Sequence, residues 1–229
     1  MEVGMEAGII ELLSTSPGGL VYHLITLFAI EAALGIALDE WQRTHQEEHQ
    51  RALFAFAGLL FTRMVLMAVA LLDWQGILIA APLVPPLERF FDTLATVLLC
   101  WAFLPPLLTN RRASQLFLAV NVITAIIAYV ALAPLWYSAS SQNPSLSYSG
   151  YWQETFWEIW QLVLLGLACV IFMLYEERSR GLLLGAFLAL LAGHILHLLF
   201  PTGPSHIAGW ERLANLIAFP LFAITIYRN

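Results

Sequence analysis

Residues 152–161 read WQETFWEIWQ and open the apolar run LVLLGLACVIFML at 162–174, which is typical of a membrane-spanning helix. Two carboxylates in this stretch, Glu154 and Glu158, are four residues apart and therefore lie on one face of the helix. The tryptophans around them are Trp152, Trp157 and Trp160. Ionisable groups at membrane depth are costly and usually face a bundle interior or a cavity, so the sequence predicts a site here.

The same layout opens two further apolar runs. Glu88 and Asp92 stand at the head of LERFFDTLATVLLCWAF. Glu211 and Asn215 stand at the head of WERLANLIAFPLFAI. In all three helices a glutamate is followed four residues later by Asp, Glu or Asn. We expect the three heads to line one polar cup at one side of the membrane.

The composition excludes several classes of protein. Of 229 residues, 60% are hydrophobic and only 11% are charged, whereas about a quarter are charged in soluble domains. All ten basic residues are arginine, so a retinal-binding protein, which needs a lysine for its Schiff base, is excluded. Neither a Walker A nor a GxSxG motif is present, and no soluble domain is left for catalysis, so we expect no enzymatic activity.

The hydrophobic runs predict an all-α polytopic membrane protein with seven transmembrane helices. Residues 1–18 form a short extracytoplasmic lead and residues 19–229 form the transmembrane domain. The predicted spans are 19–38, 51–72, 87–104, 113–135, 151–175, 181–200 and 209–227. Arginines outside the spans gather on one side: Arg43, Arg51, Arg111, Arg112, Arg178, Arg180 and Arg228. The positive-inside rule then places the N-terminus outside and the C-terminus in the cytoplasm.

A repeat is visible at the starts of spans two, four and six. Each begins with an arginine followed by a small residue, at 51–52, 112–113 and 180–181. The span that follows carries the Glu-xxx-polar head. Repeats that run in the same direction bring equivalent ends to the same side of a membrane. We therefore expect one helix followed by three helical hairpins.

Three charged residues inside the spans predict a buried ion pair. Arg63 lies roughly 18 Å along span two, Glu31 roughly 18 Å along span one, and Asp92 roughly 10 Å along span three. These depths overlap, and an unpaired charge there would be expensive. We expect Arg63 to pair with Asp92 or Glu31. The pair either fixes helix register or takes part in signalling.

Histidines add a possible metal or proton-sensitive site. His194 and His197 are three residues apart on one face of span six, and His23 and His206 lie toward the same side. The motif HExxH of zinc proteases is absent. A haem held by His23 and one histidine of span six is an alternative, as is simple hydrogen bonding to carboxylates. The cofactor is therefore open, with His194 and His197 as candidate metal ligands.

The predicted ligand site combines carboxylates, tryptophans and histidines. Its residues are Glu88, Asp92, Glu154, Glu158, Glu211, Trp152, Trp157, Trp160, Trp210, His194 and His197. Aromatic faces and negative charge together favour a cation. A lipid headgroup or a quinone ring would also fit such a wall.

Residues 193–228, GHILHLLFPTGPSHIAGWERLANLIAFPLFAITIYR, together with PPLERFFDTLATVLLCWAF at 85–103, support a resemblance. They resemble the multi-span N-terminal sensor regions of bacterial histidine kinases that carry GAF, PAS and kinase modules. The resemblance covers about residues 50–229 and is sharpest over 194–228. It implies a place in the bacterial inner membrane, no enzyme activity in this part, and a signal passed to a cytoplasmic effector, either fused or on a separate chain.

We therefore expect a sensory or ligand-binding membrane module. Its expected partners are membrane lipids, the cytoplasmic effector and a small cationic or lipid-like ligand, with no nucleic acid. The alternative is a haem-, quinone- or metal-binding membrane subunit of a redox or transport complex. A third interpretation is a structural subunit of a larger membrane assembly.

Overall fold

A computed structural model of the chain describes residues 18–79, 82–143, 145–175, 180–200 and 208–228, so the predicted lead at 1–18 lies almost wholly outside the described residues. Within these ranges all regular structure is helical, as expected. The helices are α2 (Gly18–Thr44), α3 (Glu47–Trp74), α4 (Val84–Phe103), α5 (Pro105–Thr109), α6 (Arg111–Gln142), α7 (Trp152–Leu174), α8 (Arg180–Leu199) and α9 (Gly209–Arg228).

Local sequence explains where several helices begin and end. Pro85 and Pro86 stand in the first turn of α4, where a missing N–H costs nothing. Pro105 then ends this helix, because the residue before a proline avoids helical backbone angles. At the start of α6 the Asn110 side chain accepts a hydrogen bond of 3.1 Å from the backbone N–H of Ala113. The sequence thus sets the turn between α4 and α6 locally.

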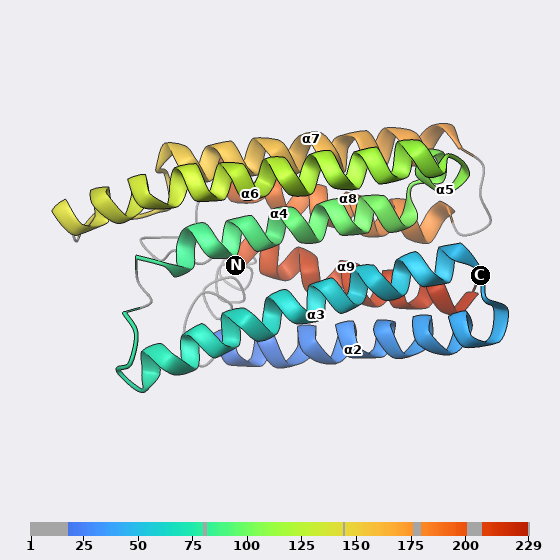
Figure 1. The fold of residues 1–229 in the computed structure, drawn as a ribbon, viewed down its shortest axis with the longest axis horizontal. Helices are drawn as coiled ribbons and strands as arrows, with labels where there is room; N and C mark the ends of the chain where they lie inside the picture. The colour runs from blue at the N-terminus through green and yellow to red at the C-terminus, as the bar shows by residue number, and fades with distance from the viewer. Residues whose placement is uncertain (1–17, 80–81, 144, 176–179, 201–207, 229) are drawn as a thin grey trace, which may run out of the picture.

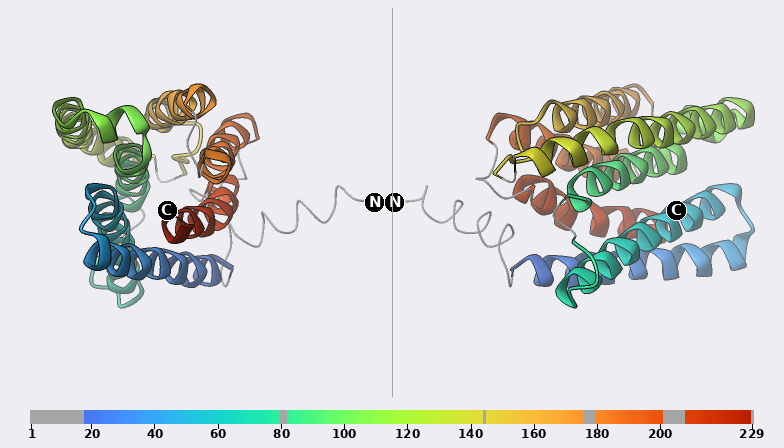
Figure 2. Two further views of the ribbon diagram at one scale, coloured as in Figure 1. Left: turned by 90° about the vertical axis from the view of Figure 1, so that its right-hand side faces the viewer. Right: turned by 60° about the vertical axis from the view of Figure 1, so that its left-hand side comes forward.

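Six of the helices form a closed ring. Neighbours pack in the order α2, α3, α4, α7, α8, α9 and back to α2. Figure 2 shows this ring along the bundle, and Figure 1 shows the helices running side by side. The heads of α4, α7 and α9 lie at the same end of the bundle, as the repeat predicted (Figure 1). Any group that points into the ring at this end meets groups from the other helices.

Helix α6 lies outside the ring and packs mainly on α4. It reaches α7 through side chains: Trp160 Nε1 donates to Asn121 Oδ1 at 3.3 Å, and Gln153 Nε2 donates to the carbonyl of Leu132 at 2.9 Å. Very little of its surface is buried. It also continues through Pro134 to Gln142, past the predicted end at residue 135. Serine hydroxyls at 140 and 141 bond to backbone carbonyls in this extension.

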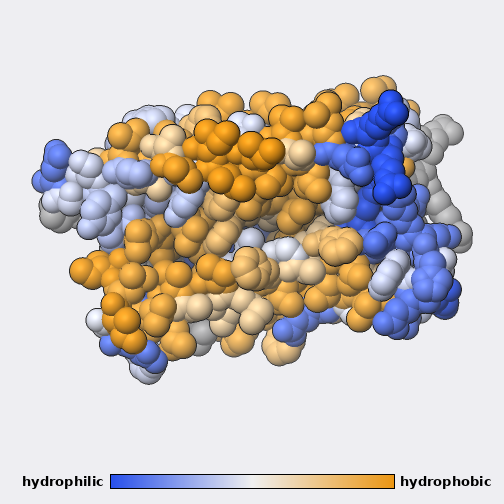
Figure 3. All heavy atoms as spheres, in the orientation of Figure 1, coloured by the Kyte–Doolittle hydropathy of each residue, from blue (hydrophilic) through white to orange (hydrophobic). Residues whose placement is uncertain are grey.

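Five helices are long and apolar enough to cross a membrane: Val21–Thr44 within α2, and α3, α6, α7 and α8. The predicted spans in α4 and α9 are not among these five: α4 carries three charged residues, and α9 carries Glu211, Arg212 and Asn215 in its first two turns. Figure 3 shows apolar side chains along the length of the bundle and hydrophilic ones gathered at the end where α2 meets α3. The chain is thus a multi-pass helical membrane protein.

Candidate functional site

The centre of the site is Arg89 on α4, whose side chain is 2% exposed. Its Nη1 atom lies 2.6 Å from Glu211 Oε2 on α9, and its Nη2 atom lies 3.0 Å from Glu154 Oε1 on α7. Glu158 Oε1 is 3.8 Å away and Asp92 Oδ2 is 3.9 Å away. One guanidinium therefore joins carboxylates from three helices of the ring. A planar guanidinium suits this arrangement, because its Nη1 and Nη2 atoms donate in different directions.

Both histidines of α8 face the same carboxylates. His194 Nδ1 lies 2.8 Å from Glu158 Oε2, and His197 Nε2 lies 3.1 Å from Glu154 Oε1. His197 Nε2 also lies 3.3 Å from Arg89 Nη2. All of these side chains are buried. We call the following group the central cluster: Arg89, Glu154, Glu158, Glu211, His194 and His197.

Two ion pairs flank the central cluster. Arg63 on α3 bonds to Asp92 Oδ1 at 2.9 Å, and Asp92 is one of its two predicted partners. Glu31, the other predicted partner, is exposed on the outer face of α2 and therefore does not belong to this pair. Arg212 on α9 lies 3.8 Å from Glu88 Oε1. Each flanking pair is neutral by itself.

The central cluster holds more carboxylates than guanidiniums. One guanidinium faces three carboxylates, so two negative charges are left over when the carboxylates are ionised and both histidines are neutral. Charges removed from water are costly unless they are compensated. Two further positive charges, either on the histidines or on a bound cation, would balance the cluster. The arrangement is therefore chemically suited to bind protons or a cation, and it contains no cysteine, serine or threonine nucleophile.

A link between α9 and α2 lies next to this cluster. The guanidinium of Arg212 stands over the ring of Tyr22, 4.9 Å from its centroid. Asn215 Nδ2 donates to the Tyr22 hydroxyl at 3.1 Å. Asn215, the polar residue at the third helix head, thus connects the last helix of the ring with the first. Tyr22 was not among the predicted site residues.

Two of the predicted tryptophans, Trp157 and Trp160, lie on the α4 and α6 side of α7. Trp157 is fully buried, stacks on Trp160 at 6.0 Å and meets Phe90 edge-on at 6.4 Å. Trp152 is 51% exposed, with its ring against Tyr151, and Trp210 is half-buried. The structure therefore brings the carboxylates and histidines together in a closed network, with tryptophans beside it rather than around an open cup.

The loop before α7 contacts Glu154 of the central cluster. Gly150, whose φ angle of 84° suits glycine, donates its N–H to Glu154 Oε2 at 2.8 Å. The ring of Tyr148 packs on Trp136 at 4.8 Å, and both side chains are buried. Burial raises the pKa of the Tyr148 hydroxyl, so this hydroxyl stays protonated. Glu154 is thus held from both sides, by the loop and by Arg89.

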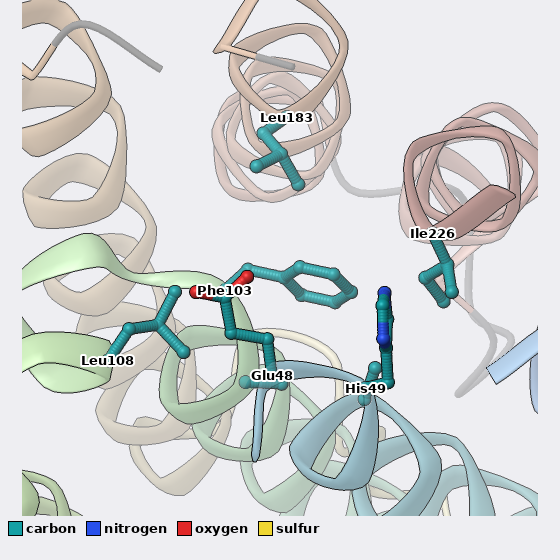
Figure 4. A pocket seen from close by; sticks show the side chains of 8 residues that line it. Glu48, His49, Phe103, Leu108, Leu183 and Ile226 are labelled. Carbon is teal, nitrogen blue, oxygen red and sulfur yellow. The ribbon is translucent and has the colours of Figure 1, made fainter. Parts of the chain in front are cut away.

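Two small cavities adjoin the bundle interior. One lies beside the central cluster, and Asp92, Gln161, His194 and Glu211 are among its lining residues. It leaves about 20 Å³ for the centres of water-sized molecules, enough for roughly one water. The other is at the opposite end of the bundle, where His49 and Glu48 face Phe103 and Ile226 (Figure 4). Water can therefore occupy the ring beside Glu211.

Sequence reasoning missed Arg89, the residue that joins the site. Its signal was present, because an arginine inside a predicted span needs a partner just as Arg63 does. Glu88, next to it in sequence, cannot be that partner, because adjacent residues of a helix do not face each other.

No family model, curated protein or solved structure matches this chain.

Proposed function

We propose that this chain is a sensory or ligand-binding module of the bacterial inner membrane, with seven spans, the N-terminus outside and the C-terminus in the cytoplasm. The observation that carries the proposal is the central cluster: a buried network that joins α4, α7, α8 and α9 and holds three carboxylates against one guanidinium. Binding of a cation there changes the forces between four helices at once. A ligand that interacts differently with two helix arrangements shifts their populations.

The proposed topology treats α4 and α9 as spans despite their charges. Both helices have 20 residues, about 30 Å, which matches the hydrocarbon core. The charged side chains near their heads face the ring, where they pair with other helices, so lipid does not have to solvate them. Arg228 is exposed at the far end of α9. The arginine-rich end supports a cytoplasmic C-terminus.

The proposed route of the signal runs along α8 and α9. These helices approach closely at Gly193, where an added Cβ would overlap the Cβ of Ala214 and lie 3.1 Å from the carbonyl oxygen of Trp210. A pair of helices in such close contact moves as one unit. Glu211 at the head of α9 is bonded to Arg89, and Arg228 is at the other end of the same helix. A displacement at the cluster therefore reaches the cytoplasmic end, where an effector would bind.

The proposal is tested by the spacing of two helix ends. Spin labels are attached to cysteines introduced at Arg43 and Tyr227, with Cys100 and Cys169 replaced by alanine, and distances are measured by electron paramagnetic resonance. We expect the combined Glu154→Gln and Glu158→Gln changes to shift the distance by about 1–2 Å, the scale of helix shifts in switching proteins.

Glu31→Gln is the matched control, because it makes the same chemical change on an exposed face of α2. This variant should leave the distance unchanged. Identical distance distributions in the cluster variant and the wild type would show that the cluster does not control the cytoplasmic end, and the proposal would be wrong.

The alternative of a haem-binding subunit has less support. The candidate haem ligands on α8, His194 and His197, contact glutamates, and the adjoining cavity has room for roughly one water. A metal ion needs no such volume.

A further inference from the structure

The geometry points to a binding site for one divalent transition-metal ion of the zinc type at Glu158, His197 and Glu211. These residues come from α7, α8 and α9, and one ligand atom from each lies within 4.8 Å of the others. The inference deepens the proposed function by naming the class of cation that the central cluster takes. It was not accessible from sequence, where the histidines at 194 and 197 stood as the candidate metal ligands.

Glu158 and Glu211 each have one oxygen atom that is free to bind an ion. Glu158 Oε1 and Glu211 Oε1 are buried and have no hydrogen-bond partner. Buried carboxylate oxygens almost always have a partner, so two such atoms side by side indicate a missing positive group. These two oxygen atoms come from different helices, α7 and α9.

The other oxygen of each glutamate already has a hydrogen-bond partner. His194 Nδ1 bonds to Glu158 Oε2 at 2.8 Å, and Arg89 Nη1 bonds to Glu211 Oε2 at 2.6 Å. Metal-binding carboxylates are commonly oriented in this way by a hydrogen bond to the oxygen that does not touch the metal. In this arrangement His194 and Arg89 position the ligands, and the two Oε1 atoms are left for the ion.

Distances and charge agree with this assignment. His197 Nε2 lies 3.6 Å from Glu211 Oε1. Two ligand atoms at about 2.1 Å from a tetrahedral zinc ion lie about 3.4 Å apart. An ion with two positive charges balances the two negative charges of the central cluster. One imidazole and two carboxylates favour zinc, iron or manganese over magnesium and calcium, which prefer oxygen ligands alone. Water in the cavity beside Glu211 would complete the coordination.

The test uses the untagged, detergent-solubilised chain, stripped with a chelator, incubated with zinc chloride and desalted. Elemental analysis should find one zinc per chain in the wild type. Glu158→Gln, Glu211→Gln and His197→Gln should each lose most of it. His194→Leu, which removes a positioning bond, should weaken zinc affinity about 10–100-fold.

Two matched controls should keep the zinc. Glu31→Gln removes a carboxylate on the exposed face of α2, and His49→Gln removes a buried histidine at the opposite end. Wild-type protein without zinc, or equal zinc in the ligand and control variants, would overturn the inference. Should the ligand variants fail to fold, cobalt(II) added to the wild type decides: ligand-field bands that disappear with chelator support the site, and a featureless visible spectrum contradicts it.

The two proposals fail separately. If the wild type binds zinc but the Glu154 and Glu158 variant has the same spacing of helix ends as the wild type, the metal site stands and the sensory function is overturned. A change of spacing in the Glu154 and Glu158 variant, with no zinc in the wild type, would do the reverse.

Discussion

The two halves of the ring enclose different interiors although the same helices surround both. Near the heads of α4, α7 and α9 the interior holds Arg89 and its carboxylates. Near the opposite end it holds phenylalanines, with Phe222 at 5.0 Å from Phe103 and 5.3 Å from Phe187. The phenylalanine half is held by apolar packing and needs no ligand. In the charged half, each buried charge needs a partner of opposite charge. Stability and responsiveness are thus located in different halves of one bundle.

The largest expected effect is that of Arg89→Met. It leaves three buried carboxylates without their guanidinium, and removing one member of a buried ion pair typically costs about 3–5 kcal/mol. We expect a strong loss of thermal stability in detergent, or no folded protein at all. A melting temperature within two or three degrees of the wild type would mean that Arg89 is dispensable to the charged half.

Phe222→Ala tests the other half. Phe222 is fully buried among Phe56, Phe103 and Phe187, so the change opens a cavity and should cost about 3 kcal/mol. It should not alter zinc content, because the phenylalanines lie away from the central cluster. Thermal unfolding and elemental analysis on the same sample check both statements. A loss of zinc in this variant would show that the two halves are coupled.

Gly193→Ala tests the close contact that links α8 to α9. The added methyl group meets Ala214 and the backbone of Trp210, so we expect a loss of about 1–3 kcal/mol. Gly185→Ala on the same helix is the control: its nearest neighbour, Leu221 Cδ1, is 3.9 Å away, so alanine fits and helix propensity favours it. Equal melting temperatures for the two variants would contradict the close approach.

The smallest effect is expected from Asn121→Leu on α6. This change removes the hydrogen bond from Trp160 Nε1, worth about 0.5–1.5 kcal/mol, while the ring itself stays intact. Zinc content and the spacing of the helix ends should be unchanged. A large loss of stability would mean that α6 supports the ring more than its few buried residues indicate.

Much of the fold follows from hydrophobic runs and helix signals. The three helix heads could be predicted because their Glu-xxx-polar spacing places both groups on one face, and the Arg63–Asp92 pair could be predicted from depth alone. The order of helices in the ring could not, because an apolar run does not reveal its neighbours. Arg89 shows the same limit: its partners lie 65 and 122 residues further along the chain. The sequence could not show that tryptophans lie beside the carboxylates, because the position of a residue on a helix does not reveal which side the next helix occupies.

The distance of 122 residues between Arg89 and Glu211 also has a consequence for biosynthesis. At about 5–20 residues per second, α9 is synthesised roughly 6–24 s after α4. During this interval Arg89 has Asp92 on its own helix, and after 65 residues it gains Glu154 on α7. The bond to Glu211 forms last, when α9 packs between α8 and α2 and completes the ring. The newly made chain therefore passes through a state in which one carboxylate of its central network is still missing, and its lifetime is set by translation.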